Sequence, residues 1–152
     1  PGLGGRSPHR HRRVSAASSE DPLRWRGDPQ VPGAAVVVDL DGTLSDAAGR
    51  QHHLERRPKD WDGFFAASGA DPLIDQIARL VELLDRDLQV VLLTARPTRV
   101  RATTLDWLER HGVRWDLLVM RADGDFRPSH EAKLDAVMLH IQNLQLKGYK
   151  ND

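Results

Sequence analysis

Residues 34–46 read Ala-Ala-Val-Val-Val-Asp-Leu-Asp-Gly-Thr-Leu-Ser-Asp, and this stretch decides the fold class that the sequence predicts. The apolar run Ala34 to Val38 is long enough for a buried strand, and it ends in Asp39 and Asp41. Because side chains alternate along a strand, both carboxylates lie on one side while Leu40 points into the core. Acids at the carboxyl end of a buried strand lie where open α/β sheets bind ligands. Since two such carboxylates repel each other without a cation or a shared proton, the pattern predicts a functional site.

The same residues also contain Asp41-Gly42, a dipeptide that is common in β-hairpin turns. A hairpin would need a second alternating strand directly after Thr43. The residues that follow, Ser45 to Arg50, are polar or small instead. We therefore favour the site over the simple turn.

Composition divides the chain into two parts, although its 152 residues suit a single folded domain. Residues 1–33 are rich in Pro, Gly, Ser, Arg and His, and their six arginines face only three acidic residues. We expect this part to be a disordered basic tail that aids solubility rather than binding nucleic acid. Residues 34–152 form the predicted core. The chain has no cysteine and no run of 18 apolar residues, so we expect neither disulfides nor a membrane span, and a cytoplasmic location.

From Ala34 onward, short apolar strands alternate with helical patterns, and this order predicts a parallel sheet with right-handed crossovers. The expected fold is a Rossmann-like, three-layer α/β/α core. Strands are predicted at 34–39, 89–94 and 115–120. A short helix is predicted around Trp61, and a second begins at the N-cap Asp71 with Pro72 in its first turn. A third helix runs from Pro97-Thr98 to a C-cap at Gly112, and the last covers 128–144. The residues expected to face the core on these helices are Phe64, Phe65, Leu73, Ile77, Leu80, Val81, Leu84, Leu105, Leu108, Leu134, Val137, Met138 and Ile141.

Two further residues stand where a phosphoryl group could be held. Thr94 ends the second strand just before a helix, so its hydroxyl and the backbone N–H groups of the helix start could meet phosphate oxygens. Arg96 could add a bidentate contact. Lys133 falls in the first turns of the last helix, where its ammonium could neutralise both a carboxylate and a phosphate. Each of these residues is a weak signal alone, and they gain weight from their order behind Asp39.

The segment Asp39-Leu40-Asp41-Gly42-Thr43, followed by Thr94 and Lys133, resembles the haloacid dehalogenase superfamily of phosphatases. A narrower likeness, over roughly residues 34–145, is to the 3′-phosphatase domain of phage-type polynucleotide kinase/phosphatases. The residues that carry this narrower likeness are Lys59-Asp60-Trp61-Asp62, Phe64, Thr94-Ala95-Arg96, Trp107-Leu108, Met120-Arg121, Gly124-Asp125-Phe126-Arg127 and Lys133.

The resemblance implies a role for each matching residue. Asp39 would be the nucleophile and form an aspartyl-phosphate, and Asp41 would be the general acid and base. One Mg²⁺ would be bound by the Asp39 carboxylate and the Asp41 backbone carbonyl. Thr94 and Lys133 would hold phosphoryl oxygens. The residues expected to contact the substrate are Thr43, Arg96 and Arg121.

The superfamily's fourth motif, an acidic pair after a further hydrophobic strand, has no counterpart near the end of this chain, where Asp152 stands alone. We expect a C-terminally truncated core whose strand 34–39 has an unpaired edge, and therefore weak or absent activity and a tendency to aggregate. The missing segment or a kinase domain could lie elsewhere, although no phosphate-binding loop of the kinase type occurs here. The adjacent His52 and His53 are read as a solvated extended loop rather than as a metal pair.

The predicted function is Mg²⁺-dependent hydrolysis of a phosphomonoester, at a DNA or RNA 3′ end. The insert after the first strand is too short for a large cap, and an open site favours a polymer end. Two alternatives stay open at this point. One is the same chemistry on a small phosphorylated metabolite, and the other is a non-catalytic remnant that binds phosphate or a partner protein.

Overall fold

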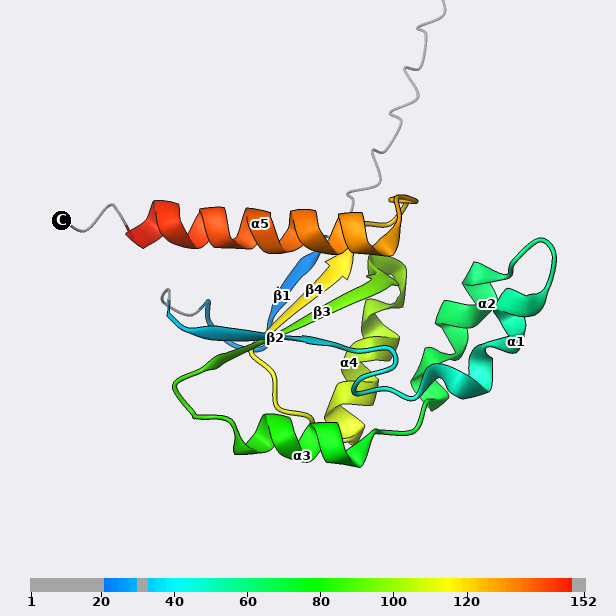
Figure 1. The fold of residues 1–152 in the computed structure, drawn as a ribbon, viewed down its shortest axis with the longest axis horizontal. Helices are drawn as coiled ribbons and strands as arrows, with labels where there is room; N and C mark the ends of the chain where they lie inside the picture. The colour runs from blue at the N-terminus through cyan, green and yellow to red at the C-terminus, as the bar shows by residue number, and fades with distance from the viewer. Residues whose placement is uncertain (1–20, 30–32, 149–152) are drawn as a thin grey trace, which may run out of the picture.

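The computed structural model describes residues 21–29 and 33–148, and it has a four-stranded sheet at its centre (Figure 1). The strand order is β1-β4-β3-β2, and the strands are β1 Leu23–Trp25, β2 Ala35–Asp39, β3 Gln89–Pro97 and β4 Leu117–Arg121. Strand β3 pairs in parallel with both β2 and β4. The predicted α/β fold with a parallel sheet is therefore confirmed, with one antiparallel strand in addition.

That antiparallel strand, β1, lies within the stretch that the sequence assigns to a disordered tail. Leu23 pairs with Val119 and Trp25 with Leu117 at the edge of the sheet. Both side chains pack against the apolar cluster on that face, whereas Arg24 between them is exposed. The boundary at residue 33 is thus wrong for these three residues, because tertiary burial of two large side chains outweighs the polar composition around them. Residues 1–20 lie outside the part of the chain that the structure describes.

Helices cover both faces of the sheet, as a three-layer α/β/α arrangement requires (Figure 1). Helix α5 (Ser129–Gly148) lies on one face, and helices α3 (Asp75–Leu83) and α4 (Arg101–Arg110) lie on the other. Because side chains alternate along each strand, each face of the sheet has its own apolar core. Leu92 packs with Trp107 of α4 on one face, and Leu93 packs with Val137 of α5 on the other. The three-layer prediction is confirmed.

A small insert follows β2 and stands beside the sheet (Figure 1). It consists of a 3₁₀ turn Ala47–Arg50, helices α1 (His52–Glu55) and α2 (Trp61–Ala66), and a 3₁₀ turn Ala67–Ala70. The short helix predicted around Trp61 is confirmed. The extended loop predicted for His52 and His53 is wrong, because both residues lie in α1 with ring centroids 4.2 Å apart.

The start of α2 is fixed by a capping aspartate. Asp60 accepts hydrogen bonds from the Gly63 N–H at 2.8 Å and lies 2.9 Å from Nδ1 of His53. The Gly63 hydrogen bond, and then the one to His53, hold the pKa of Asp60 below its ordinary value. A Cβ at position 63 would meet the Asp60 carboxylate at 2.2 Å, so a side chain there would displace the capping aspartate.

Several predicted helix details need correction. Helix α3 begins at Asp75, not at Asp71, because the Asp71 carboxylate is buried in tertiary contacts described below. Leu80, Leu134 and Met138, which the sequence places on apolar stripes, are exposed. Helix α4 ends at Arg110 with His111 as its C-cap, and the predicted glycine, Gly112, follows it with a φ of +61°.

Strand β2 lies at an edge of the sheet, and among the described residues it pairs only with β3. Val37, in the middle of β2, keeps 48% of its surface exposed. The edge that the sequence predicts for this strand is therefore present. None of the helices within residues 21–29 and 33–148 has both the length and the apolar character needed to span a membrane.

The core on both faces of the sheet predicts which shortened side chain lowers the free energy of unfolding most. Leu118 in the central strand β4 is fully buried, whereas Leu83 at the end of α3 is 81% exposed. We expect Leu118→Ala to lower the free energy of unfolding by about 2–5 kcal/mol, because it removes buried methyl groups and leaves a cavity. The matched change Leu83→Ala should cost less than about 0.5 kcal/mol. Urea unfolding followed by circular dichroism measures both, and equal losses would contradict this account of the core.

Candidate active site

The alternation of β2 brings Asp39 to the face of the sheet that α5 covers. Val36 and Val38 pack on the α3 and α4 side, so Asp39 points to the other side. Its Oδ2 lies 2.7 Å from Nζ of Lys133, and its Oδ1 accepts a hydrogen bond from the Leu40 N–H at 2.8 Å. The two residues that the sequence assigns to nucleophile and charge neutralisation are therefore in direct contact, although they are 94 positions apart.

Asp41, just beyond β2, is held by two buried guanidinium groups. Nη2 of Arg96 donates to Oδ1 at 2.7 Å, and Nε of Arg96 lies 3.2 Å from Oδ2. Arg50 donates to the same Oδ1 through its Nη2. Both arginines are almost completely buried, so the orientation of the Asp41 carboxylate is fixed from the interior of the protein.

A second aspartate, Asp71, balances the charge of these arginines. Nε of Arg50 donates to Asp71 Oδ1 at 2.9 Å, and the Ser45 hydroxyl donates to Oδ2 at 2.5 Å. Nη2 of Arg96 lies 3.6 Å from the same carboxylate. Asp41, Arg50, Asp71 and Arg96 thus form a cluster of two cations and two anions, called the Asp41 cluster below.

Sequence reasoning missed Arg50 and Asp71. Arg50 lies in a polar insert that reads as surface, and Asp71-Pro72 reads as a helix start. Their partners are 9 to 26 residues away along the chain, and no local period connects them. The only signal in the sequence was that several arginines and aspartates occur near the Asp39 motif. Composition alone does not say which of them form ion pairs.

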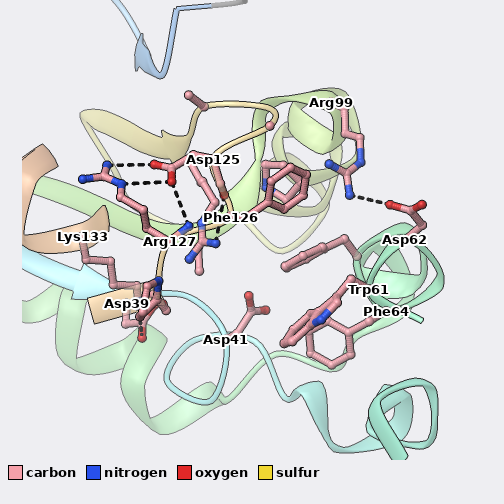
Figure 2. A pocket seen from close by; sticks show the side chains of 18 residues that line it. Asp39, Asp41, Trp61, Asp62, Phe64, Arg99, Asp125, Phe126, Arg127 and Lys133 are labelled. Carbon is pink, nitrogen blue, oxygen red and sulfur yellow. Dashed lines mark hydrogen bonds and ion pairs between the residues drawn. The ribbon is translucent and has the colours of Figure 1, made fainter. Parts of the chain in front are cut away.

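A pocket of about 550 Å³ opens beside this arrangement. Figure 2 shows Asp39 and Lys133 on one side of it, Trp61 and Phe64 on the other, and Asp41 between them. The lining comes from β2, α2, the end of β3, the β4–α5 loop and the start of α5, and comprises Asp39, Asp41, Trp61, Asp62, Phe64, Phe65, Ala95, Pro97, Arg99, Arg121, Ala122, Gly124, Asp125, Phe126, Arg127, Pro128, Ser129 and Lys133. Its volume is within the usual range for small-molecule sites.

The rim of the pocket is held by ion pairs. Arg99 bridges Asp62 of α2 at 2.7 Å and Asp123 of the β4–α5 loop at 2.6 Å. In that loop Arg127 donates from its side chain and its backbone N–H to Asp125, and this holds the pKa of Asp125 down at about 2. These contacts tie the insert to the loop that precedes α5.

The predicted site residues fall into two groups. Asp39, Asp41, Arg121 and Lys133 line the pocket. The Nε of Arg121 is buried and has no hydrogen-bond partner among the described residues. The other predicted residues, Thr43, Thr94 and Arg96, are not among the lining residues.

Arg96 and Thr94 are occupied inside the protein. Arg96 is fully buried, and its guanidinium donates hydrogen bonds to Asp41, Ser45 and Thr104 rather than making the predicted phosphate contact. The buried Thr94 hydroxyl accepts the Arg96 N–H at 3.1 Å. Thr43 lies half-buried in the turn after β2. The assignment of Thr43 and Thr94 as phosphate contacts stays a prediction.

The donor set fits a hard divalent cation. Asp39 and Asp41 offer oxygen atoms at one edge of the sheet, and Mg²⁺ is usually bound by one or two carboxylates together with water and substrate phosphate. Among the described residues no group of three or more His, Cys, Asp or Glu side chains gathers to hold a metal. Any ion at this site would therefore depend on the two aspartates and on oxygens of the substrate.

The fold and this site define the chain as a phosphatase domain of the haloacid dehalogenase type. Residues 33–145 match the family model of the polynucleotide kinase PNKP phosphatase domain, and the chain belongs to this family. None of the curated proteins matches the chain.

Two solved structures are similar to the chain. One chain of the Pnkp1/Rnl/Hen1 complex is 28% identical, with a TM-score of 0.59, over 73% of this chain and 35% of that chain. A chain of the Pnkp1/Rnl/Hen1 RNA repair complex is 26% identical, with a TM-score of 0.61, over 84% of this chain and 36% of that one. The chain thus spans about a third of the length of these structural relatives.

The Asp41 cluster predicts a large effect of removing one charge. Asp71→Ala leaves two buried guanidinium groups with a single carboxylate, and we expect the free energy of unfolding to fall by about 3–5 kcal/mol. The control Asp106→Ala breaks an exposed ion pair with Arg110 and should cost less than about 0.5 kcal/mol. Urea unfolding compares them. A loss below about 1 kcal/mol for Asp71→Ala would show that the cluster is not strongly coupled.

The ion pair between Asp125 and Arg127 in the β4–α5 loop predicts that the Asp125 carboxyl titrates at a lower pH than a free aspartate. Because the folded-state pKa of Asp125 lies below its ordinary value of 3.8, the stabilisation it provides is present above pH 3.8 and is lost as the pH falls through about 2. We expect the Asp125 carboxyl ¹³C resonance to titrate with a midpoint near 2. Arg127→Gln should move that midpoint towards 3.8. A wild-type midpoint near the ordinary value would contradict the contact.

Proposed function

We propose that this chain is a polynucleotide 3′-phosphatase that removes the phosphoryl group from a DNA or RNA 3′ end through an aspartyl-phosphate on Asp39. The observation that carries the proposal is the 2.7 Å contact between Asp39 and Lys133 at the edge of the sheet, beside Asp41 and inside a pocket. Membership in the PNKP phosphatase family and the likeness to a chain of an RNA repair complex support a nucleic-acid substrate. Nucleic-acid repair in the cytoplasm, with protein partners of its own, is part of the same proposal.

The reaction would take place in two balanced steps. First, a carboxylate oxygen of Asp39 attacks phosphorus, the bond from phosphorus to the 3′ oxygen breaks, and Asp41 gives a proton to the leaving oxygen. Then water attacks phosphorus, Asp41 takes up its proton, and the bond from phosphorus to Asp39 breaks. Inorganic phosphate and the original carboxylate result.

The remaining residues would stabilise charge and orientation. Lys133 neutralises the negative charge that Asp39 and the phosphoryl oxygens share. Arg50 and Arg96 keep the Asp41 carboxylate at the reacting oxygen, so Arg96 acts as a positioning residue in this proposal. Arg121, Thr43 and Thr94 remain the proposed contacts to the substrate.

The proposed cofactor is Mg²⁺, held by the Asp39 carboxylate and the Asp41 backbone carbonyl. When bound, the ion masks the charge between nucleophile and phosphate. Removal of divalent cations with EDTA is expected to stop turnover, and added Mg²⁺ to restore it.

The test is phosphate release under single-turnover conditions, with the chain in excess so that slow hydrolysis is measurable. We expect release from a 3′-phosphorylated oligonucleotide, and far less from the 5′-phosphorylated isomer and from glucose 6-phosphate. Faster release from the sugar phosphate would favour a metabolite phosphatase. No release from any of the three would favour a non-catalytic remnant.

Variants separate chemistry from folding. Asp39→Asn removes the nucleophile and should reduce the rate about 1,000-fold or more. Lys133→Met should reduce it about 100- to 1,000-fold, since one charge-stabilising group is lost. The control Asp75→Asn changes an exposed residue of α3 that does not line the pocket, and it should keep the wild-type rate. Activity retained by Asp39→Asn would rule out the covalent route.

A further inference from the structure

Two large aromatic side chains of the pocket are left in contact with solvent. Phe126 is 91% exposed and Trp61 is 48% exposed, and both line the cavity that contains Asp39. Single exposed apolar residues are common on proteins. Two aromatic rings in one cavity beside a reactive carboxylate are more specific, because exposed apolar surface within a concave site is typical of ligand contact.

The Trp61 ring is held in place before any ligand arrives. It lies edge-on to Phe64 and stacked against Phe65, with both centroid distances at 5.9 Å. Phe64 is buried, and the guanidinium of Arg50 lies 4.1 Å from its ring centroid while also donating to its carbonyl at 3.1 Å. The aromatic wall is thereby fixed to the Asp41 cluster, which reduces the ordering cost of binding a flat ligand.

Phe126 comes from the other side of the site, from the loop between β4 and α5. Its neighbours in that loop are fixed, because Arg127 binds Asp125 and Nη1 of Arg121 donates to the Asp125 carbonyl at 3.2 Å. In Figure 2 Phe126 lies above Asp41, and Trp61 lies to its right. Both rings therefore border the space next to Asp41, where the group bonded to a transferred phosphate would have to lie.

The polar groups on this side of the pocket are already in use. Arg99 is paired with Asp62 and Asp123, and Arg127 is paired with Asp125 and Asp135. A sugar with many hydroxyls would need hydrogen-bond partners, and these side chains are already paired with one another. A nucleobase needs chiefly a flat apolar surface, since each base presents two π faces that stack on aromatic rings.

We propose that this pocket is a nucleobase subsite, in which the base of the 3′-terminal nucleotide stacks on Trp61 and contacts Phe126 while its phosphate meets Asp39 and Lys133. The proposal rests on the proposed function and adds the substrate group that the enzyme recognises next to the phosphate. Because stacking needs no hydrogen-bond readout, the subsite accepts any of the bases. It binds an end that carries no base more weakly.

The test compares two 3′-phosphorylated oligonucleotides that differ only in the terminal residue, thymidine in one and an abasic tetrahydrofuran in the other. We expect the wild-type KM to be about 5- to 100-fold lower for the thymidine end, with similar kcat. Trp61→Leu and Phe126→Ala should each raise the KM for the thymidine end and leave the abasic substrate nearly unchanged. The control Leu83→Ala removes an exposed apolar side chain that does not line the pocket, and it should change neither KM.

A binding measurement separates this inference from the catalytic proposal. Fluorescence anisotropy with the same oligonucleotides, labelled at the 5′ end, gives the Kd without turnover. Tighter binding of the thymidine end that is lost in Trp61→Leu supports the subsite even if no phosphate is released. Equal Kd values for the two ends, or equal weakening of both by Trp61→Leu, would overturn it whether or not the chain hydrolyses them.

Discussion

Three buried charges, on Arg50, Asp71 and Arg96, and the partly buried charge on Asp41 place constraints on most of the structure around the site. Their formal charges cancel, and each carboxylate accepts hydrogen bonds from the arginines. Buried ions are tolerated only when they are paired in this way, because desolvating a lone charge costs several kcal/mol. The end of β2, the insert, the segment before α3 and the end of β3 must therefore keep the relative positions that allow the pairing.

The cluster also connects Asp41 with the aromatic wall of the pocket. Arg50 contacts Asp41 and Asp71 at one end and the ring and carbonyl of Phe64 at the other. The Trp107 indole N–H donates to the Asp71 carbonyl at 2.8 Å, so α4 contributes to the same arrangement. The small insert can thus hold the aromatic wall of the pocket in place, because its Arg50 side chain is fixed in the core.

The rest of the site depends on the two faces of one strand. Leu40 is fully buried among the residues of α3 and α4, whereas Asp39 faces α5 and meets Lys133. A shift of register by one residue would exchange these faces and separate the ion pair. The parallel pairing of Asp39 with Leu93 in β3 fixes that register.

The sequence by itself determined the layered fold, the strand that carries Asp39 and Asp41, and the association of Lys133 with that strand. The fold and the strand follow from local periodicity and from the rule that parallel strands present their carboxyl ends at one edge, whereas Lys133 was assigned from its order behind Asp39 and from the family resemblance. Only the tertiary structure decided that Leu23–Trp25 joins the sheet, that Asp71 is a buried counter-ion rather than a helix cap, and that Arg96 binds Asp41 instead of solvent or phosphate. These outcomes depend on burial and on charge pairing between segments far apart in the chain. A periodic pattern carries no information about such pairs, because the partner that stabilises each group is chosen by the folded packing.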